Sequence, residues 1–377
     1  MRIGIEAQRV FRRNKHGMDY VVLQEVLQLQ QIDHANEYYI FVKPGPDRCV
    51  EDSGNVHVVE LSAPTYPLWE QWALPRAAKR LGVELLHCTS NTAPLRCDIP
   101  LILTLHDIIF LEPRDKGNHS LYQNMGWFYR RLVVPRILGK CRRIITVSNF
   151  EKANIIEKLH IPEARMAMIY NGYNEWFRPL TDDEGAQVFS KYMKEPGFLF
   201  FLGNTDPKKN TERTLVAYSE YLRKSAVKRP LLMADLDRGY LSDIIRRNGI
   251  ENIEGHIFMP GYIPNADLPS IYNAAFAFLY TSLRESFGIP LLEAMACGTP
   301  VVTSNTSSMP EIGGAEAMLV NPESSGEIAQ MLLRLETDAA FYQRQREVGL
   351  ARARRFSWRS TATELLQLYS ASLRGDE

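Results

Sequence analysis

Two glutamates eight positions apart have the spacing and setting of a site for a phosphorylated ligand. Glu285 and Glu293 lie in TSLRESFGIPLLEAMACGTPVVTS, residues 281–304, where a turn follows a strand-like run and Pro290 suits a first helical position. The backbone N–H groups of such a helix start can bind an anion, for which a diphosphate is suitable. Glu293 would then accept hydrogen bonds from ribose hydroxyls, and Glu285 would reach a sugar beyond the phosphates. The plainer alternative is two solvated charges beside an ordinary strand-to-helix turn.

The surrounding residues favour the ligand site, because they carry a resemblance to a known family. The run E-S-F-G-I-P-L-L-E-A-M-A-C-G-T-P-V-V is similar to the signature of retaining glycosyltransferases of family four, which have the GT-B fold. FLFFLGNTDPKKNTERTL, residues 198–215, resembles the family's Gly-x-x-x-Pro-Arg-Lys-Asn segment. Further matching pieces, in the family's order, are NGYN (171–174), GYIPNADLPSIYNAA (261–275) and SMPEIG (308–313). The resemblance covers nearly the whole chain and is sharp from 198 to 320.

The resemblance implies roles for two lysines that would otherwise be typical of an exposed loop. Lys208 and Lys209 would hold the diphosphate of a nucleotide sugar and offset the charge that grows on the leaving group. Lys208 stands where the family more usually has Arg, so we do not expect a bidentate clamp there. The nucleobase would lie against the backbone at Tyr262 and Ile263. The expected nucleotide-sugar-binding residues are Gly17, Gly203, Asn204, Tyr262, Ile263, Ser286, Phe287, Gly288, Ile289, Leu291, Leu292 and Glu293.

The N-terminal half resembles the family less closely. LTLHDIIFLEP (103–113) is similar to a strand end that carries a His-Asp pair, and IITVSNFEKANI (144–155) is similar to a helix start. His106 and Asp107 would project from the carboxyl edge of a parallel sheet and position the donor or the acceptor. We therefore group them with Glu285, Lys208 and Lys209 as catalytic candidates. The alternatives are that a backbone group satisfies the histidine and that the aspartate caps the next segment.

No metal or cofactor is expected. Asp235-Leu236-Asp237 matches the short acidic triplet with which other glycosyltransferases bind a divalent cation. A motif of only three residues, however, often matches by chance. They also follow a different strand from the predicted diphosphate site. We therefore expect a metal-independent enzyme.

A basic run without acidic residues extends from Arg130 to Arg143. Its interpretation stays open between a solvated helix face and contact with anionic lipid head groups or a lipid diphosphate acceptor. The cationic residues are Arg130, Arg131, Arg136, Lys140, Arg142 and Arg143.

Composition limits the partners and the compartment. Lys and Arg balance Asp and Glu at 44 each, so the chain has no overall charge that would attract nucleic acid. No apolar run approaches the roughly 18 residues of a membrane span, and the short apolar start is not a signal peptide. The five cysteines are an odd number without a CxxC pair, which argues against disulfides and zinc. We expect a cytoplasmic protein that lies at most peripherally on the inner face of the cell membrane.

The elements that must position these residues alternate between strand and helix patterns from end to end, which predicts parallel sheets covered on both faces. We expect an α/β protein of the GT-B class, with two doubly wound Rossmann-like domains facing a central cleft and a C-terminal helix crossing back to the first domain. The predicted domains are 1–178 on the acceptor side and 179–357 for the nucleotide sugar. Residues 358–377 would form the returning helix.

The resemblance implies a retaining transferase that moves a hexose from a nucleoside diphosphate sugar to a glycan or a lipid-linked glycan. GDP-mannose is the favoured donor because Gly-Asn-x-x-Pro-x-Lys-Asn at 203–210 looks like mannosyltransferases of this family. Surface polysaccharide or lipopolysaccharide assembly is the implied setting. The alternatives are a nucleotide-sugar epimerase of similar fold and a catalytically silent scaffold that binds sugar nucleotides.

Overall fold

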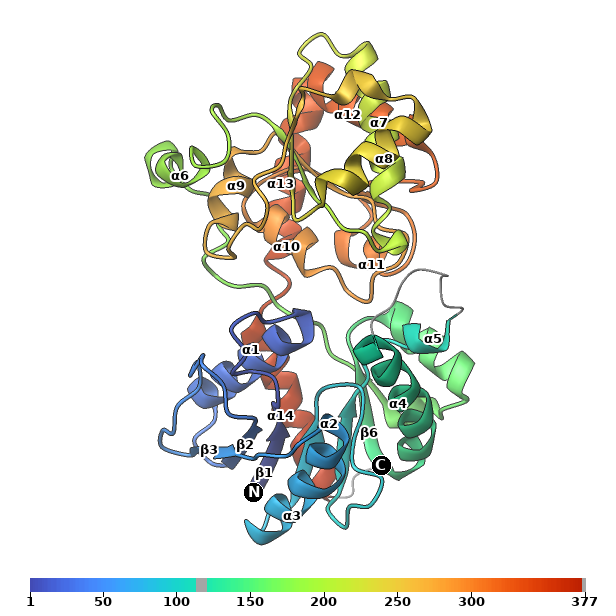
Figure 1. Ribbon diagram of the computed structural model, residues 1–377. Coiled ribbons are helices and arrows are strands. Elements are labelled where there is room, and N and C mark those ends of the chain that lie inside the picture. Colours follow the sequence, from blue (N-terminus) through green and yellow to red (C-terminus); the bar gives the residue numbers. More distant parts are fainter. Residues whose placement is uncertain (113–120, 375–377) are drawn as a thin grey trace. The chain divides into compact units, whose positions relative to one another are not determined.

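The structure, a computed structural model, describes residues 1–112 and 121–374, which form two α/β units (Figure 1). The first unit comprises Met1–Gly172 and Trp358–Glu377, and the second comprises Tyr173–Ser357. The sequence placed this boundary after residue 178. Residues following Gly172 belong with the second unit because Phe177 packs edge-on against Tyr272 and the Arg178 carbonyl accepts a hydrogen bond from Asn273.

The described residues of the first unit form a seven-stranded parallel sheet in the order β3-β2-β1-β4-β5-β6-β7. Its central strands are continuous apolar runs that are buried on both faces, as parallel strands between helices require. The strands are β1 (Arg2–Glu6), β2 (Glu37–Val42), β3 (Val56–Glu60), β4 (Leu85–Cys88), β5 (Leu101–Thr104), β6 (Cys141–Thr146) and β7 (Met166–Met168).

Helices cover both faces of this sheet (Figure 1). They are α1 (Gly17–Ile32), α2 (Tyr66–Leu68), a π-helical turn (Trp69–Ala73), α3 (Leu74–Arg80), α4 (Leu121–Ile137), α5 (Asn149–Leu159) and α14 (Trp358–Arg374). Three short 3₁₀ turns complete the unit at Ile109–Leu111, Leu138–Lys140 and Glu163–Arg165.

The last helix, α14, returns to the first unit and packs beside α1. Its buried Tyr369 hydroxyl lies 2.7 Å from Nδ1 of His87 in β4. At its start, the Thr361 hydroxyl donates a hydrogen bond of 2.7 Å to the Tyr170 carbonyl. The C-terminal helix is therefore part of the first unit's core, although residues 375–377 lie outside the described residues.

The second unit contains a six-stranded parallel sheet in the order β10-β9-β8-β11-β12-β13. The strands are β8 (Leu199–Leu202), β9 (Leu231–Ala234), β10 (Ile257–Phe258), β11 (Ala277–Tyr280), β12 (Val301–Ser304) and β13 (Met318–Val320). The helices are α6 (Asp182–Phe189), α7 (Thr211–Lys224), α8 (Arg238–Asn248), α9 (Leu268–Ala274), α10 (Ile289–Ala296), α11 (Met309–Gly313), α12 (Ser325–Thr337) and α13 (Ala339–Ala353). Strand order reverses between β8 and β11, and such a switch point is where open α/β sheets bind ligands.

Candidate active site

Two loops meet at the switch point of the second unit. The loop after β8 carries Gly203 to Lys209, and the loop after β11 carries residues 281–288. The backbone N–H of Leu283 donates to the Lys208 carbonyl at 2.7 Å, which joins the loops directly. Both loops are predicted from the sequence to bind one ligand, and the structure brings them together.

Lys209 and Glu285 form an ion pair across the two loops. Lys209 Nζ lies 2.6 Å from Glu285 Oε1, and the two side chains are 28% and 14% exposed. Next to the pair lies the buried Tyr280, whose ring centroid is 5.9 Å from Lys209 Nζ. Burial, and then the negative charge of Glu285, raise the pKa of Tyr280 well above its ordinary value. Lys209, which is predicted to bind phosphate, and Glu285, which is predicted to bind the sugar, thus pair with each other in this structure.

Lys208 is oriented differently from Lys209. Its ammonium pairs with Asp206 at 3.2 Å, and the same carboxylate caps the Lys208 backbone N–H at 3.1 Å. Asp206 opens the 3₁₀ turn Pro207–Lys209, so the pair is local to this exposed turn. The two lysines therefore differ in partner.

Asn210 anchors the lysine loop from below. It adopts a left-handed conformation, with φ +60°, and its buried amide donates to the carbonyls of Thr281 at 3.0 Å and Pro322 at 2.7 Å. Asparagine tolerates this conformation better than other side chains, because its amide can hydrogen-bond locally. Asn210 thereby fixes the lysines relative to the Glu285 loop.

Two serines hold the backbone of Glu285 in place. The Glu285 N–H donates to Ser307 Oγ at 2.9 Å, and Ser308 Oγ donates to the carbonyls of Glu285 at 2.9 Å and Phe287 at 3.1 Å. Ser308 begins the SMPEIG stretch that resembles the family, but neither serine was predicted to have a role. Two adjacent serines in the loop after β12, the strand beside β11, are the signal that could have found them.

The start of α10 has the expected strand-turn-helix geometry. Gly288 has φ +110°, a backbone conformation that side-chain-bearing residues rarely adopt, so glycine is required. The side chains of Phe287, Leu291 and Leu292 are buried in the unit, while Ser286 and Ile289 are partly exposed. Residues 286–292 can therefore meet a ligand mainly through their backbone.

Glu293 lies one turn into α10, in apolar surroundings near Tyr272 and Cys297. Within the described part of the chain, no group donates a hydrogen bond to its carboxylate. Desolvation raises the pKa of Glu293 to about 8. A partly exposed carboxyl in this condition is suited to accept hydrogen bonds from the hydroxyls of a ligand.

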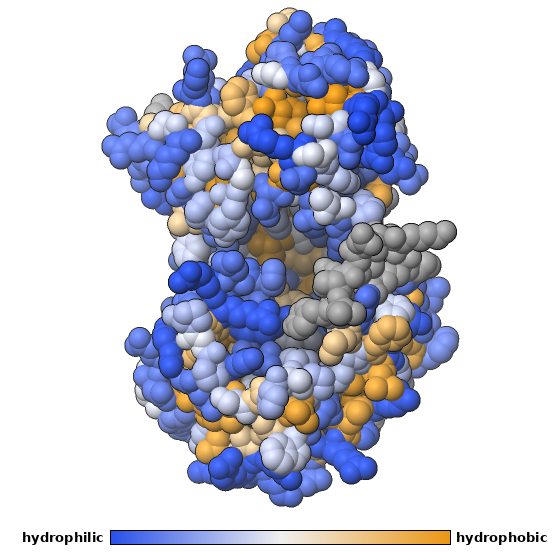
Figure 2. Space-filling view, viewed as in Figure 1, coloured by the Kyte–Doolittle hydropathy of each residue, from blue (hydrophilic) through white to orange (hydrophobic). Residues whose placement is uncertain are grey.

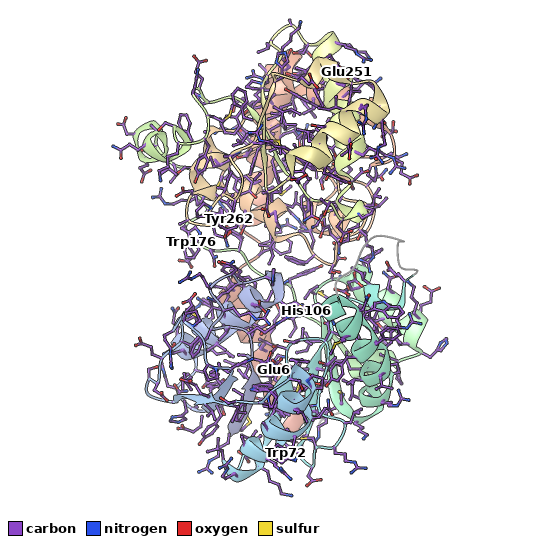
Figure 3. All side chains as sticks on the ribbon, in the orientation of Figure 1. Glu6, Trp72, His106, Trp176, Glu251 and Tyr262 are labelled. Atoms are coloured by element: carbon purple, nitrogen blue, oxygen red, sulfur yellow. The ribbon has the colours of Figure 1, made fainter. Side chains whose placement is uncertain are left out.

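Four more residues predicted for the nucleotide lie in the loops that follow β8 and β10. Gly203 has a packing reason to be glycine, since a Cβ would lie 2.8 Å from the Ala234 carbonyl oxygen. Asn204 accepts a hydrogen bond from the Asp206 N–H at 2.8 Å, so its side chain shapes the loop. Ile263 is buried, whereas the Tyr262 ring is 67% exposed and lies at the surface of the unit (Figure 3).

In the first unit, His106 lies just beyond β5 and is buried (Figure 3). Its Nε2 donates to the Thr89 carbonyl at 2.9 Å, because a carbonyl can only accept. Desolvation lowers the pKa of His106, so the ring is neutral and its Nδ1 is an acceptor. Asp107 caps the 3₁₀ turn through the Ile109 N–H at 3.0 Å. Both alternatives left open from the sequence, a satisfied histidine and a capping aspartate, are thus present.

Asn91 is a positioning residue that was not predicted from the sequence. It is buried with φ +67°, and its Oδ1 accepts the His106 N–H at 2.7 Å. A strained non-glycine residue of this kind at a strand end is often found at functional sites. Gly17, the first residue of α1, has no positive φ, and a Cβ there would meet nothing within 4 Å. The fold itself therefore does not require glycine at position 17.

Comparison with known proteins matches both units. The family described as Glycosyl transferases group 1 matches residues 185–352, and Glycosyltransferase Family 4 matches residues 16–176. The O-antigen chain mannosyltransferase B of Escherichia coli is 32% identical over 273 residues, which cover 71% of this chain and 69% of that protein. The chain belongs to glycosyltransferase family 4.

Two further similarities are to another mannosyltransferase and to a solved structure. The serotype-specific mannosyltransferase WbdA of Escherichia coli is 29% identical over 282 residues, and the match spans 70% of the transferase described here but only 33% of WbdA. Sucrose-phosphate synthase from Thermosynechococcus elongatus has the same fold, with a TM-score of 0.77, 19% identity and complete coverage of both chains. The transferase is thus a GT-B hexosyltransferase.

The acidic triplet of the transferase has a structural role. Asp237 Oδ1 accepts the Tyr240 N–H at 2.9 Å and so caps α8, while Asp235 has φ +61°. Among the residues that the structure describes, no three His, Cys, Asp or Glu side chains form a metal-binding group.

The basic run of the transferase includes cations that serve the fold. Arg131 donates to the Phe110 carbonyl at 3.2 Å, Lys140 donates to the Leu95 carbonyl, and Arg142 donates to the Ser372 carbonyl of α14. These contacts tie α4 and its neighbours to the first unit. No helix in the described ranges is long and apolar enough to cross a membrane.

Proposed function

We propose that the transferase moves a hexose, with mannose from GDP-mannose as the favoured case, to a hydroxyl of a glycan or lipid-linked glycan. We further propose that it retains the anomeric configuration and needs no metal ion. The observation that carries the proposal is the Lys209–Glu285 pair at the switch point, beside the start of α10. The mannosyltransferase names of two relatives support the choice of hexose.

The ion pair suggests that Lys209 and Glu285 would separate on donor binding and contact different parts of the donor. A diphosphate at the α10 start would attract Lys209, so the lysine would exchange the Glu285 carboxylate for phosphate oxygens. Glu285 would then be available to accept hydrogen bonds from the hexose, and Glu293 from the ribose. Lys208, which has only a local partner in Asp206, would add positive charge at the edge of the phosphates.

The proposed chemistry is same-face displacement. As the bond from the hexose to the leaving phosphate breaks, the acceptor hydroxyl attacks from the same face and its proton passes to the phosphate oxygen. The lysines and the helix N–H groups would stabilise the negative charge on the leaving group, which is the role a cation has in other transferases. In the first unit, Nδ1 of neutral His106 would accept a hydrogen bond from a sugar hydroxyl and orient it.

The names of the O-antigen and serotype-specific relatives support a role in surface polysaccharide or lipopolysaccharide assembly. We propose that this work takes place on the cytoplasmic side of the cell membrane, with the enzyme in peripheral contact with it.

The test is an incubation of the purified chain with GDP-mannose or UDP-glucose and a mannose-terminated oligosaccharide after exhaustive chelation of metals. We expect GDP release from GDP-mannose, and a product linkage that nuclear magnetic resonance shows to be of the same anomeric configuration as the donor. Activity that returns only with magnesium or manganese would contradict metal independence, and an inverted linkage would contradict retention.

A parallel incubation without acceptor separates the alternatives. A transferase shows at most slow donor hydrolysis under these conditions, whereas an epimerase converts the hexose of the donor. A silent scaffold would bind the nucleotide sugar, as seen in a thermal-shift assay, without turnover in either incubation.

A further inference from the structure

Large apolar side chains are exposed together on one part of the first unit. Five of the nine such side chains in the described residues lie on α4 or on the α2 segment with its π-helical turn. They are between 49% and 65% exposed, and they are Leu68, Trp72, Met125, Phe128 and Leu132. Figure 2 shows apolar surface gathered over α4 and near α2. Exposed apolar groups are unremarkable when scattered, but a cluster of this kind marks an interaction site.

The outward face of α4 carries a row of apolar side chains. Met125, Phe128 and Leu132 are spaced by three and four positions, so they share one side of the helix. Val133, Val134 and Ile137 on the opposite side are buried in the core. The helix therefore has an apolar face toward the core and a second apolar face toward the exterior.

A buried polar network joins α4 to the α2 segment. Glu70 in the π-helical turn is fully buried and accepts hydrogen bonds from the hydroxyls of Tyr66, Thr92 and Tyr129. Gln71 adds a bond of 2.7 Å to the Tyr129 hydroxyl of α4. Because one carboxylate receives donors from both elements, the two exposed apolar groups are held at fixed positions relative to each other.

Cations border this α2–α4 surface. The Arg76 guanidinium lies 3.8 Å from the centroid of the Trp72 ring, and the Arg131 guanidinium lies 4.5 Å from that of Trp127. Arg136 is exposed at the end of α4, and Lys140 is exposed in the 3₁₀ turn that follows. The sequence has no Asp or Glu from 121 to 143, and its sole acid from 66 to 80 is the buried Glu70. A chain with zero net charge thus concentrates positive charge around one apolar surface.

We propose that the α2–α4 surface is a membrane-binding face that inserts its apolar side chains into the interface of an anionic bilayer. Tryptophan, phenylalanine and leucine beside arginine and lysine are the composition of interfacial membrane-binding helices. The apolar stems of Arg and Lys cover the border while their charges reach anionic head groups. The charge complementarity favours a lipid surface over a second copy of this neutral chain. The contact thus depends on the apolar row as well as on the basic run.

Co-sedimentation with phosphatidylglycerol vesicles, and with phosphatidylcholine vesicles as the uncharged comparison, tests the proposal. We expect binding to the anionic vesicles that weakens with added salt. Phe128→Ser and Leu132→Ser should each lower the partition constant about tenfold, because each removes a buried apolar side chain from the interface. Val227→Ser replaces an exposed apolar residue of the second unit and should leave binding unchanged.

The border charges and Trp72 give independent readouts. Arg136→Gln should lower partition about fivefold on anionic vesicles and leave weak binding to uncharged ones unchanged. Tryptophan emission should shift to the blue on vesicle addition, and Trp72→Phe should remove much of that shift.

Three results would overturn the proposal. These are absence of binding to anionic vesicles at low salt, full binding by the Phe128→Ser and Leu132→Ser variants, and a concentration-dependent self-association of the chain that the same two substitutions abolish. The last would assign the surface to a second copy. Because neither residue belongs to the donor site, turnover with a soluble oligosaccharide should be unchanged in both variants. Failure of the membrane proposal is therefore distinguishable from failure of the proposed transfer reaction.

Discussion

The candidate catalytic groups at the carboxyl edges of the two sheets differ in their exposure and in their bonding partners. In the second unit, Lys209 and Glu285 are partly exposed, lie on separate loops and pair with each other. In the first unit, His106 is buried and its ring N–H is bonded to the Thr89 carbonyl. A pair of opposite charges at a surface can exchange partners at modest cost, whereas a buried ring with a backbone partner is fixed. The second unit is thus built to respond to a charged ligand, and the first to hold one orientation.

The largest expected effect concerns Lys209 in the second unit. Lys209→Ala should lower turnover by about 100-fold or more, as loss of one strong donor to a developing anion does elsewhere. Lys208→Ala is the matched control and should cost less, because that ammonium pairs with Asp206 within its own turn. Steady-state kinetics measures both, and a circular dichroism melt confirms folding. Equal effects of the two substitutions would erase the distinction between the lysines.

The next prediction separates the two glutamates. Removal of a charged acceptor from buried hydroxyls costs about 1.5 to 3 kcal/mol, so Glu293→Ala should weaken binding of the free nucleoside diphosphate by about 10-fold to 100-fold. Glu285→Ala should leave that binding nearly intact, since it also frees Lys209 for phosphate, but should reduce turnover. Calorimetry and kinetics together decide the point. If Glu285→Ala alone abolished nucleotide binding, the donor would lie the other way across the loop.

A smaller effect is expected in the first unit, where Asn91 helps to hold His106. Asn91→Ala removes the acceptor of the His106 N–H, and we expect about a tenfold loss of turnover with little change in nucleotide affinity. Asn91→Asp keeps an acceptor oxygen and should restore orientation. Its charge should also raise the pKa of His106, which would move the acid limb of the pH–rate profile upward. An unchanged profile in Asn91→Asp would leave Asn91 a purely structural residue.

The smallest effect compares two carboxyls whose pKa is raised by desolvation, the buried Glu25 and the partly exposed Glu293. Burial raises the pKa of Glu25 in α1 and of Glu293 to about 8 each. Because these folded-state pKa values lie above the ordinary value, each carboxyl contributes stability that is fully present below about pH 4.5 and is lost as pH rises through about 8. Glu25→Gln should therefore flatten the fall of unfolding free energy over that interval in urea titrations.

A nucleoside diphosphate should act on one of these carboxyls alone. If Glu293 binds ribose hydroxyls in its charged form, nucleotide affinity should strengthen as pH rises toward 8 in the parent chain and in Glu25→Gln, but not in Glu293→Gln. Calorimetry across this pH range measures the difference. A pH-dependent affinity that persists in Glu293→Gln would show that another group is responsible.

The sequence predicted the fold because strand and helix patterns alternate without interruption, and it predicted which loops of the second unit meet. It did not predict that Lys209 and Glu285, 76 positions apart, pair directly. It also missed the Ser307 and Ser308 bonds to the Glu285 loop. Such contacts depend on side-chain direction and on exact strand register, which local patterns do not encode. The apolar exterior of α4 was hidden for a related reason, since a run of cations suggested a charged face.

The return of α14 to the first unit makes the second unit an insertion. Residues 173–357 form one uninterrupted stretch, whereas the first unit is assembled from two separate stretches of chain. The Thr361–Tyr170 hydrogen bond shows that the two cut ends of the first unit already lie together. A short glycine-serine bridge from Gly172 to Trp358 would therefore yield a continuous miniature of the acceptor side. The second unit could be expressed as a single fragment, so that donor binding and acceptor binding could be measured on separate proteins.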